Sequence, residues 1–380
     1  MNRNWIYALI VPCLTIGVCL LGAEITLRFM PVYMGLRVQN VSKEQPLFRF
    51  KANRHFNWSI GWRFLNSNEG HTNNAGFVND QNYDANGAGP LLAVVGDSYI
   101  EALMVPYSDT LQGRLQAEVG ASGRVYSFAA SGAPLSQYMA WARNARDVYR
   151  PDGLVVVVVG NDFDESLAVY KQGPGFHHFF ETSDGDLVLR VVPYRRGWVS
   201  RIAAGSALFY YLVNHLHALE LMGNLRALLK HLQVIVQTDG KNGAPEYVGN
   251  TAAKATKRRL QLSKRAVDKF LEMLPSESGL PPSRILIVVD AIRGSIYYPE
   301  RAVANDKSYF AEMRRYLMER GRMRGIAIVD LQGPMTEAFL RDGRKFEWQF
   351  DSHWNAHGHE VVAEAVSKTP LFRSLFPIRP

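Results

Sequence analysis

Short apolar runs alternate with amphipathic segments along most of this chain. Apolar runs that could form buried strands lie at 91–97, 124–130, 154–159, 284–290 and 325–331. Helical patterns lie near 109–119, 136–149, 252–274, 305–321, 334–340 and 355–368. Such alternation predicts parallel strands joined by crossover helices, and the six apolar residues from Leu154 to Val159 are expected at the centre of the sheet. The sequence therefore predicts an α/β fold.

The alternation is interrupted between 163 and about 253. This stretch holds an aromatic and histidine-rich segment at 176–180, a Val- and Leu-rich piece at 187–193 and a helical pattern from about 203 to 236. It is too long for an ordinary connection, and long insertions are usually covers or interaction surfaces. We interpret it as a cap inserted into a domain of residues 91–380.

The N-terminal run from Trp5 to Ala23 carries no charge over 19 residues. An apolar helix of this length can cross the hydrocarbon core of a membrane. Three interpretations are open: a retained anchor, a cleaved signal peptide, and a lipoprotein signal that ends at Cys19. Leu21-Gly22-Ala23 matches a cleavage site only in part, and the bulky Val18 makes a poor lipoprotein motif. The sequence favours an uncleaved transmembrane helix within residues 1–30.

Residues 31–90 are rich in Asn and aromatic side chains and show no long periodic pattern. We interpret them as a lead-in or stalk that packs on the following domain. The formal net charge of +8 and the isoelectric point near 9.4 favour some attraction to anionic surfaces. The chain's two cysteines, Cys13 and Cys19, both lie in the N-terminal run, so the remaining residues can form no internal disulfide.

The first predicted strand of the sheet leads directly into Gly96-Asp97-Ser98. In open α/β sheets, ligands bind at the carboxyl ends of the strands, where side chains are rigidly held yet exposed. Gly96 suits a tight turn, and Asp97 can accept hydrogen bonds from nearby backbone N–H groups. A simple turn is the alternative, because Gly, Asp and Ser all favour turns.

Further groups suited to acyl chemistry follow the other strands. Gly132 offers a backbone N–H after the second strand, and Asn161 offers a side-chain amide after the third. Asp351 and His353 lie two residues apart, which in an extended segment places both side chains on one side, about 6.5 Å apart at Cα. The carboxylate can then bind imidazole Nδ1 and leave Nε2 to take a proton from Ser98. A serine nucleophile needs such a base, and its tetrahedral intermediate needs oxyanion donors.

At these residues the chain resembles the SGNH, or GDSL-type, hydrolase superfamily. The four residues that name the family correspond to Ser98, Gly132, Asn161 and His353, and the resemblance covers about 91–367. It implies a flavodoxin-like three-layer α/β/α sandwich, a covalent acyl-serine intermediate, and no metal or organic cofactor. It also implies that the oxyanion is bound by the backbone N–H groups of Ser98 and Gly132 and by the amide of Asn161.

The segment around His353 departs from the common esterase pattern, which has two residues between the last Asp and His where this chain has only Ser352. Asp-x-His-Trp is more similar to a subgroup of membrane-linked polysaccharide O-acetyltransferases and related peptidoglycan-modifying enzymes. In the alginate O-acetyltransferases, however, the Asp-His pair precedes the serine, whereas here it follows. We therefore expect ester hydrolysis or O-acyl transfer, with Ser98, His353 and Asp351 as catalytic residues.

The expected substrate is an ester or an acylated carbohydrate of the cell envelope, with envelope polysaccharide machinery as a candidate partner. The protein would be membrane-anchored, with its catalytic domain outside the cytoplasm, in the periplasm. One alternative is a plain carboxylesterase for small or lipid-like esters. The other is a non-catalytic scaffold subunit of an envelope polysaccharide machine.

Several other features favour structural interpretations. The histidine pairs at 177–178 and at 357 and 359 lack the cysteines or the His-Glu-x-x-His spacing of a zinc site. The basic helix at 252–274 is typical of a solvated face, with anionic lipid or an acidic glycan as the next choice, and no nucleic-acid-binding module accompanies it. The aromatic segment at 176–180 either packs in the cap's core or lines a sugar-binding groove.

Overall fold

The computed structural model describes residues 4–198, 201, 203–217 and 255–377. The chain divides into two units, which are described separately. The N-terminal unit consists of Met1–Leu36, Arg54–Gly70 and Arg196–Lys241, and the sheet unit consists of Arg37–Asn53, His71–Arg195 and Asn242–Pro380. All the candidate catalytic residues belong to the sheet unit.

Five parallel strands form the centre of the sheet unit. They are β3 (Leu91–Gly96), β4 (Arg124–Ala129), β5 (Gly153–Val158), β8 (Ile285–Val289) and β9 (Ala327–Asp330). Their spatial order is β4-β3-β5-β8-β9. Counted along the chain this order is 2-1-3-4-5, the doubly wound flavodoxin-like topology. The predicted fold class is confirmed, and β5 is the central strand, as its unbroken apolar run indicated.

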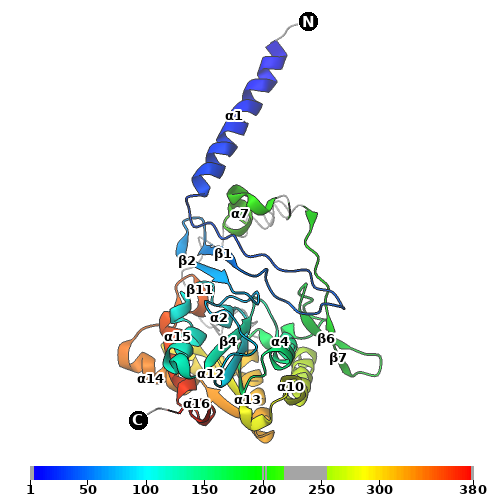
Figure 1. The fold of residues 1–380 in the computed structure, drawn as a ribbon, viewed down its shortest axis with the longest axis vertical. Helices are drawn as coiled ribbons and strands as arrows, with labels where there is room; N and C mark the ends of the chain where they lie inside the picture. The colour runs from blue at the N-terminus through cyan, green and yellow to red at the C-terminus, as the bar shows by residue number, and fades with distance from the viewer. Residues whose placement is uncertain (1–3, 199–200, 202, 218–254, 378–380) are drawn as a thin grey trace. The chain divides into compact units, whose positions relative to one another are not determined.

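Helices cover both faces of this sheet (Figure 1). One layer contains α4 (Leu135–Val148), α5 (Asp162–Glu165), α10 (Lys257–Ser278) and α13 (Tyr309–Met323), which pack on one another. The other contains α3 (Leu111–Val119), α14 (Gln332–Asp342), α15 (Ala356–Ser367) and α16 (Pro370–Leu375). Leu92, Val94 and Val155 on this second face are fully buried against that layer. Coverage on both faces explains why the strands are apolar throughout rather than alternating.

Local signals in the sequence set several helix boundaries. Asn355 caps α15 by accepting a hydrogen bond from the Gly358 N–H at 2.9 Å, as predicted. Ser308 caps α13 through the Ala311 N–H in the same way. Gly279 ends α10 with a left-handed backbone, φ +69°, which a residue without Cβ adopts at no steric cost.

Short elements at and near the strand ends complete the sheet unit. They are α2 (Ser98–Glu101), α11 (Arg293–Tyr297), α12 (Ala302–Asn305), β10 (Glu347–Trp348), β11 (Asp351–Trp354), and the 3₁₀ helices η1 (Tyr107–Asp109), η2 (Gly120–Ser122), η4 (Pro282–Arg284) and η5 (Pro299–Arg301). Strands β10 and β11 pair antiparallel, so the segment that carries Asp351 and His353 is extended, as expected.

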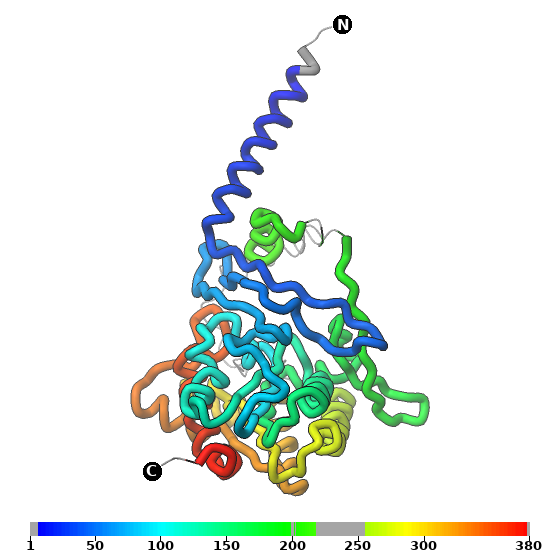
Figure 2. The backbone as a smooth tube through the Cα atoms, in the orientation of Figure 1, coloured from blue at the N-terminus to red at the C-terminus, as the bar shows by residue number. Residues whose placement is uncertain are grey.

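The described part of the predicted cap contains an antiparallel hairpin that the sequence did not predict. It is formed by β6 (His177–Glu181) and β7 (Leu187–Val191), and Figure 2 shows its course. Phe176, His177, His178 and Phe179 are buried, so the aromatic segment packs in the interior. Residues 218–253 of the predicted cap lie outside the described residues.

The basic face of α10 is paired with acidic side chains of its own unit. Arg259 forms an ion pair with Asp164, Arg265 with Glu181 at 3.0 Å, and Lys264 with Glu312 at 2.7 Å. These cations therefore join α10 to α5, to the β6–β7 hairpin and to α13.

The N-terminal unit contains α1 (Asn4–Leu27), β1 (Arg54–Ile60), all but the last two residues of β2 (Leu65–Thr72), η3 (Ala203–Gly205) and α7 (Ala207–Asn214). Strands β1 and β2 form a two-stranded sheet. Within α1, the 21 residues Tyr7–Leu27 are long and apolar enough to cross a membrane, with a mean hydropathy of 2.2 over a window of 18 residues. The boundaries predicted at residues 30, 90 and 163 stay predictions.

Candidate active site

Ser98 stands at the carboxyl end of β3, where the strand turns into α2. A Cβ on Gly96 would lie 2.5 Å from Ile100 Cγ1, so only glycine allows this turn to be so tight. Asp97 caps α2 by accepting a hydrogen bond from the Tyr99 N–H at 2.9 Å. Ser98 is the first residue of α2, and the first N–H groups of a helix have no intrahelical acceptor. The hydroxyl and the backbone N–H of Ser98 therefore both lie at this turn between β3 and α2.

His353 and Asp351 meet Ser98 from a strand more than 250 residues later in the chain. His353 Nε2 lies 2.7 Å from Ser98 Oγ. His353 Nδ1 lies 2.5 Å from Asp351 Oδ1, which also accepts the His353 backbone N–H at 3.1 Å. With Nδ1 donating to the carboxylate, Nε2 is the ring nitrogen free to accept the serine proton. The structure therefore brings together the three residues singled out from the sequence.

The carboxyl group within this trio, Asp351, and the one beside it, Asp97, have pKa shifts in opposite directions. Burial alone would raise the pKa of Asp351, but its hydrogen bonds with His353 and the charge of that ring outweigh burial and lower it. Asp351 thus stays ionised, as a partner for an imidazolium must. Burial raises the pKa of Asp97 to about 6, although the Tyr99 N–H stabilises its charged form. Ser98 Oγ lies 3.3 Å from Asp97 Oδ2, so this carboxyl group borders the candidate nucleophile directly.

Gly132 follows β4 in a loop that Glu101 holds. Its backbone has φ +77°, a conformation that favours glycine. The buried Glu101 of α2 accepts hydrogen bonds from both the N–H, at 2.8 Å, and the hydroxyl of Ser131. Burial raises the pKa of Glu101 to about 7. The helix that carries the nucleophile therefore also fixes the residue next to Gly132.

Asn161 follows β5 and is nearly buried, with 9% of its surface exposed. Its Nδ2 lies 3.2 Å from Glu165 Oε2. The same oxygen pairs with the ammonium of Lys171, whose Nζ lies 3.4 Å from the carbonyl oxygen of Gly132. Two of the three oxyanion residues expected from the sequence, Gly132 and Asn161, are therefore linked through one ion pair, and the amide of Asn161 donates to Glu165.

The loop that bears Lys171 is held by the β6–β7 hairpin. The His178 ring binds the Glu165 carbonyl oxygen through Nδ1 and accepts the Gly173 N–H through Nε2, both at 2.9 Å. Burial lowers the pKa of His178, which keeps the ring neutral and able to accept. This histidine is thus a structural residue of the loop.

A buried arginine, Arg293, connects α2, which carries Ser98, to β11, which carries His353. Arg293, which is fully buried, donates to the Tyr99 hydroxyl and to the Ser352 carbonyl oxygen, both at 2.9 Å. It also pairs with Glu347 at 2.6 Å and with Asp290, which follows β8, at 3.4 Å. Ser352 and Trp354, the residues before and after His353, are thus both held in place. Arg293 binds the Ser352 carbonyl oxygen, and Trp354 donates a hydrogen bond to Asp290 at 3.1 Å.

The sequence offered a signal for only part of this network. Asp290 ends an apolar strand, and the rule that located Ser98 and Asn161 would have located it too. Arg293, Glu347 and Lys171 belong to no motif, and their roles depend on contacts between distant segments.

The two histidines of α15, His357 and His359, have structural surroundings. His359 is buried and accepts the Leu111 N–H at 3.1 Å, and burial lowers its pKa to about 3. His357 lies 3.1 Å from Glu360. Among the described residues, no group of three or more His, Cys, Asp or Glu side chains is placed to hold a metal ion.

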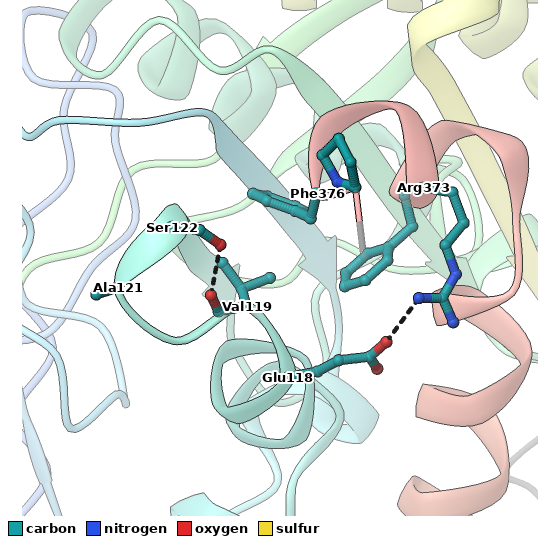
Figure 3. Close-up of a pocket in the computed structure, with 8 residues that line it drawn as sticks. Glu118, Val119, Ala121, Ser122, Arg373 and Phe376 are labelled. Atoms are coloured by element: carbon teal, nitrogen blue, oxygen red, sulfur yellow. Dashed lines mark hydrogen bonds and ion pairs between the residues drawn. The ribbon is translucent and has the colours of Figure 1, made fainter. Parts of the chain in front are cut away.

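A hollow of about 620 Å³ lies at the opposite, amino end of the sheet, between α3 and α16 (Figure 3). It is lined by Glu118, Val119, Phe372, Arg373 and Phe376 among others. None of the candidate catalytic residues lines it, so size alone does not mark the functional site.

No family model matches the sequence, and no curated protein matches it. Among solved structures, the chain is similar to the lipase/acylhydrolase from Enterococcus faecalis, at 13% identity and a TM-score of 0.39, over 77% of this chain and 100% of that one. It is similar to a lipolytic protein of the G-D-S-L family from Veillonella parvula, at 10% identity and a TM-score of 0.36, over 74% and 98% of the two chains. It is also similar to a catalytic mutant of an acetylxylan esterase from Geobacillus stearothermophilus, at 12% identity and a TM-score of 0.38, over 75% and 95%.

Likenesses this distant assign neither an activity nor a substrate to the chain. The functional conclusion therefore depends on the atoms around Ser98.

Proposed function

We propose that this chain is a serine-dependent ester hydrolase or O-acyltransferase that works through an acyl-Ser98 intermediate. The observation that carries the proposal is the 2.7 Å contact between Ser98 Oγ and His353 Nε2, with Asp351 on the other ring nitrogen. A serine hydroxyl that only packs or caps a helix needs no imidazole oriented by a carboxylate.

In the first half-reaction, Ser98 Oγ attacks the ester carbonyl carbon while its proton moves to His353 Nε2. Negative charge develops on the carbonyl oxygen, and the N–H groups of Ser98 and Gly132 with the amide of Asn161 stabilise it. The ester C–O bond then breaks, and the imidazolium gives its proton to the leaving alkoxide. The acyl group remains on Ser98.

In the second half-reaction, His353 takes a proton from an incoming hydroxyl group, whose oxygen attacks the acyl carbon. Collapse of the second tetrahedral intermediate breaks the bond to Ser98 Oγ, which recovers its proton from His353. Water as the acceptor gives a carboxylic acid, and a sugar hydroxyl gives a new ester. Asp351 orients the imidazole and stabilises its charged form in both halves.

We propose an acylated carbohydrate of the cell envelope as the substrate. The support is the similarity of Asp351-Ser352-His353-Trp354 to polysaccharide-modifying enzymes and the partial exposure of the catalytic groups. Ser98 and His353 are only half-buried, so a polymer can reach them without the fold opening. Phe176 and Phe179 are buried, so they do not add to this argument.

A fluorophosphonate probe tests the chemistry, because it reacts only with an activated serine. Full-length protein in mild detergent should be labelled, and Ser98→Ala should abolish labelling and hydrolysis of p-nitrophenyl acetate. Ser122→Ala is the matched control, because the Ser122 hydroxyl only binds the Val119 carbonyl oxygen at 2.6 Å, at the other end of the sheet. A folded protein that is never labelled would instead support a scaffold role.

The choice of acceptor for the acyl group tests the proposed substrate class. The acyl-enzyme formed from p-nitrophenyl acetate is offered water alone or water with envelope oligosaccharides, and the products are identified by mass spectrometry. Acetylated oligosaccharide indicates transfer. Release of acetate from acetylated glycans indicates a carbohydrate esterase, and equal turnover of simple esters whatever the sugar indicates a plain carboxylesterase.

A further inference from the structure

The end of the apolar helix α1 is bound to α7 through Glu24. The Glu24 carboxylate accepts hydrogen bonds from the Ser206 hydroxyl at 2.9 Å, the Ala207 N–H at 3.2 Å and the Leu208 N–H at 2.9 Å. These are the N–H groups that a helix leaves without partners, and a negative charge at this end of a helix is stabilising. Helix α7 therefore begins against the carboxyl-terminal end of α1 (Figure 1).

Arg28 makes a second link at the same place. It pairs with Glu24 at 2.8 Å and donates to the Gly205 carbonyl oxygen at 3.1 Å. The last turns of α1 are thus part of the folded N-terminal unit. Cleavage at the partial site after Ala23 would leave Glu24 at the new N-terminus, without the helical turns that precede it, which favours retention of α1.

Helix α7 lacks the polar face of an ordinary surface helix. Its sequence, Ala-Leu-Phe-Tyr-Tyr-Leu-Val-Asn, contains no charged residue. Its side chains after Ala207 are nevertheless at least partly exposed, and Leu212 has 38% of its surface exposed. A surface helix in water normally turns charged or polar residues outward. Helix α7 is instead suited to an apolar environment.

More exposed apolar side chains belong to the same unit. Phe29 and Met30, directly after α1, are 85% and 43% exposed, and Trp62 is 60% exposed. The Tyr211 hydroxyl of α7 donates to the Trp62 carbonyl oxygen at 3.1 Å, so Trp62 lies beside α7. The Arg63 guanidinium stands 4.5 Å from the centre of the Trp62 ring. Tryptophan, tyrosine and arginine are typical of the boundary between lipid and water.

We propose that α7, Phe29, Met30 and Trp62 form a membrane seat, a surface that lies in the interface of the lipid bilayer that α1 crosses. The argument for lipid is continuity: the seat adjoins a helix whose apolar side chains are exposed along its length, and Glu24 and Arg28 join the two. The apolar side chains would enter the outer acyl-chain region, and Arg28 and Arg63 would meet anionic headgroups. A second copy of the chain or a protein partner is the competing occupant.

Site-directed spin labelling of the full-length protein tests the seat. Cys13 and Cys19 are the chain's only cysteines, so their replacement by serine gives a background for one label. The label is placed at Leu212→Cys or, as the matched control, at Val303→Cys, an apolar residue of the sheet unit that is 72% exposed. The protein is reconstituted in vesicles of phosphatidylethanolamine and phosphatidylglycerol.

Collisions of the label with oxygen, which partitions into lipid, are compared with collisions with an aqueous nickel chelate. We expect the oxygen-to-nickel ratio at 212 to exceed that at 303 about tenfold. Equal ratios would overturn the proposal, and so would dipolar broadening between labels at 212, which would assign the surface to a second copy.

Two further measurements test the links to α1. Glu24→Ala should increase the mobility of the label at 212, and an unchanged spectrum would contradict the role of Glu24. The intact mass of the protein from membranes should include residues 5–23, and a mass without them would overturn the retention of α1. Neither result depends on esterase activity.

Discussion

The two ends of the parallel sheet are built from different kinds of residue. At the carboxyl end, Asp97, Asp162 and Asp290 follow β3, β5 and β8, and each is 1% exposed or less. Burial raises the pKa of all three. Burying an ionisable group is unfavourable unless partners compensate, so these carboxyl groups are costly to the fold.

At the amino end, the hollow between α3 and α16 has apolar walls. Val119, Phe372 and Phe376 are buried there, and the charged pair Glu118 and Arg373 stays partly exposed with its atoms 3.2 Å apart (Figure 3). The contacts described at this end are apolar packing and one partly exposed ion pair. The comparison teaches that buried polar groups, rather than cavity volume, distinguish the end of the sheet where we propose the active site.

The largest expected effect is on catalysis by the histidine. His353→Gln keeps a polar side chain but removes the base, so kcat for p-nitrophenyl acetate should fall by at least about 10⁴-fold. Asp351→Asn should cost less, about 10²-fold to 10⁴-fold, because the base remains but loses its orienting charge. Arg373→Gln at the other end is the control. Loss of activity in Arg373→Gln equal to that in His353→Gln would remove the distinction between the two ends.

Much of the candidate active site at the carboxyl end could be predicted from the sequence because its parts are local. The strands were visible as apolar runs, and Ser98, Gly132 and Asn161 directly follow three of them. Asp351 and His353 share one short strand, so their mutual geometry needed only a two-residue spacing.

The supporting contacts could not be predicted, since they join segments that the fold alone brings together. Arg293 reaches Ser352, 59 residues later, and Glu347, 54 residues later. The position of Lys171 depends on the β6–β7 hairpin. The alternation of apolar runs and helical patterns did not reveal this hairpin, because its strands are short and lie in an insertion. At the amino end, the need for Gly123 could not be predicted either. A Cβ at this position would lie 2.3 Å from Phe376 Cε1, and no sequence motif indicates that contact.

The second largest expected effect is on the free energy of unfolding, through the buried Glu101, and it depends on pH. Burial raises the pKa of Glu101 from 4.5 to about 7, so between these values the folded chain keeps a proton that the unfolded chain has lost. Stability should therefore fall as pH rises from 4.5 to about 7 and then level off, by on the order of 3 kcal/mol for this group.

Glu101→Gln should lessen this slope, because the side chain no longer titrates. Apparent midpoints of thermal unfolding, measured from pH 5 to pH 8 in mild detergent, give the slope for each protein. Glu118→Gln, at the exposed end, should keep the parent slope. Parallel curves for the parent and Glu101→Gln would contradict the assigned role of burial.

A smaller effect is expected at the ion pair beside the oxyanion residues. Lys171→Met leaves the Glu165 carboxylate unpaired next to Asn161, where it competes with the developing oxyanion for the amide and repels its charge. We expect kcat to fall about tenfold with KM little changed, since the repulsion grows in the transition state.

The double variant Lys171→Met with Glu165→Gln should recover most of that loss, because it removes the unpaired charge. Lys171→Arg should retain activity. If the double variant is as slow as Lys171→Met, the ammonium acts by some route other than neutralising Glu165. Labelling by fluorophosphonate in each variant separates this result from failure of the proposed chemistry.

The smallest effect belongs to the ion pair at the amino end. Glu118→Gln breaks the pair with Arg373, but both side chains are partly exposed, so water and salt already screen their attraction. The expected loss of stability is at most about 1 kcal/mol, with kcat unchanged. A large loss of activity in Glu118→Gln would mean that the two ends of the sheet are coupled, and that buried carboxyl groups do not by themselves delimit the functional region.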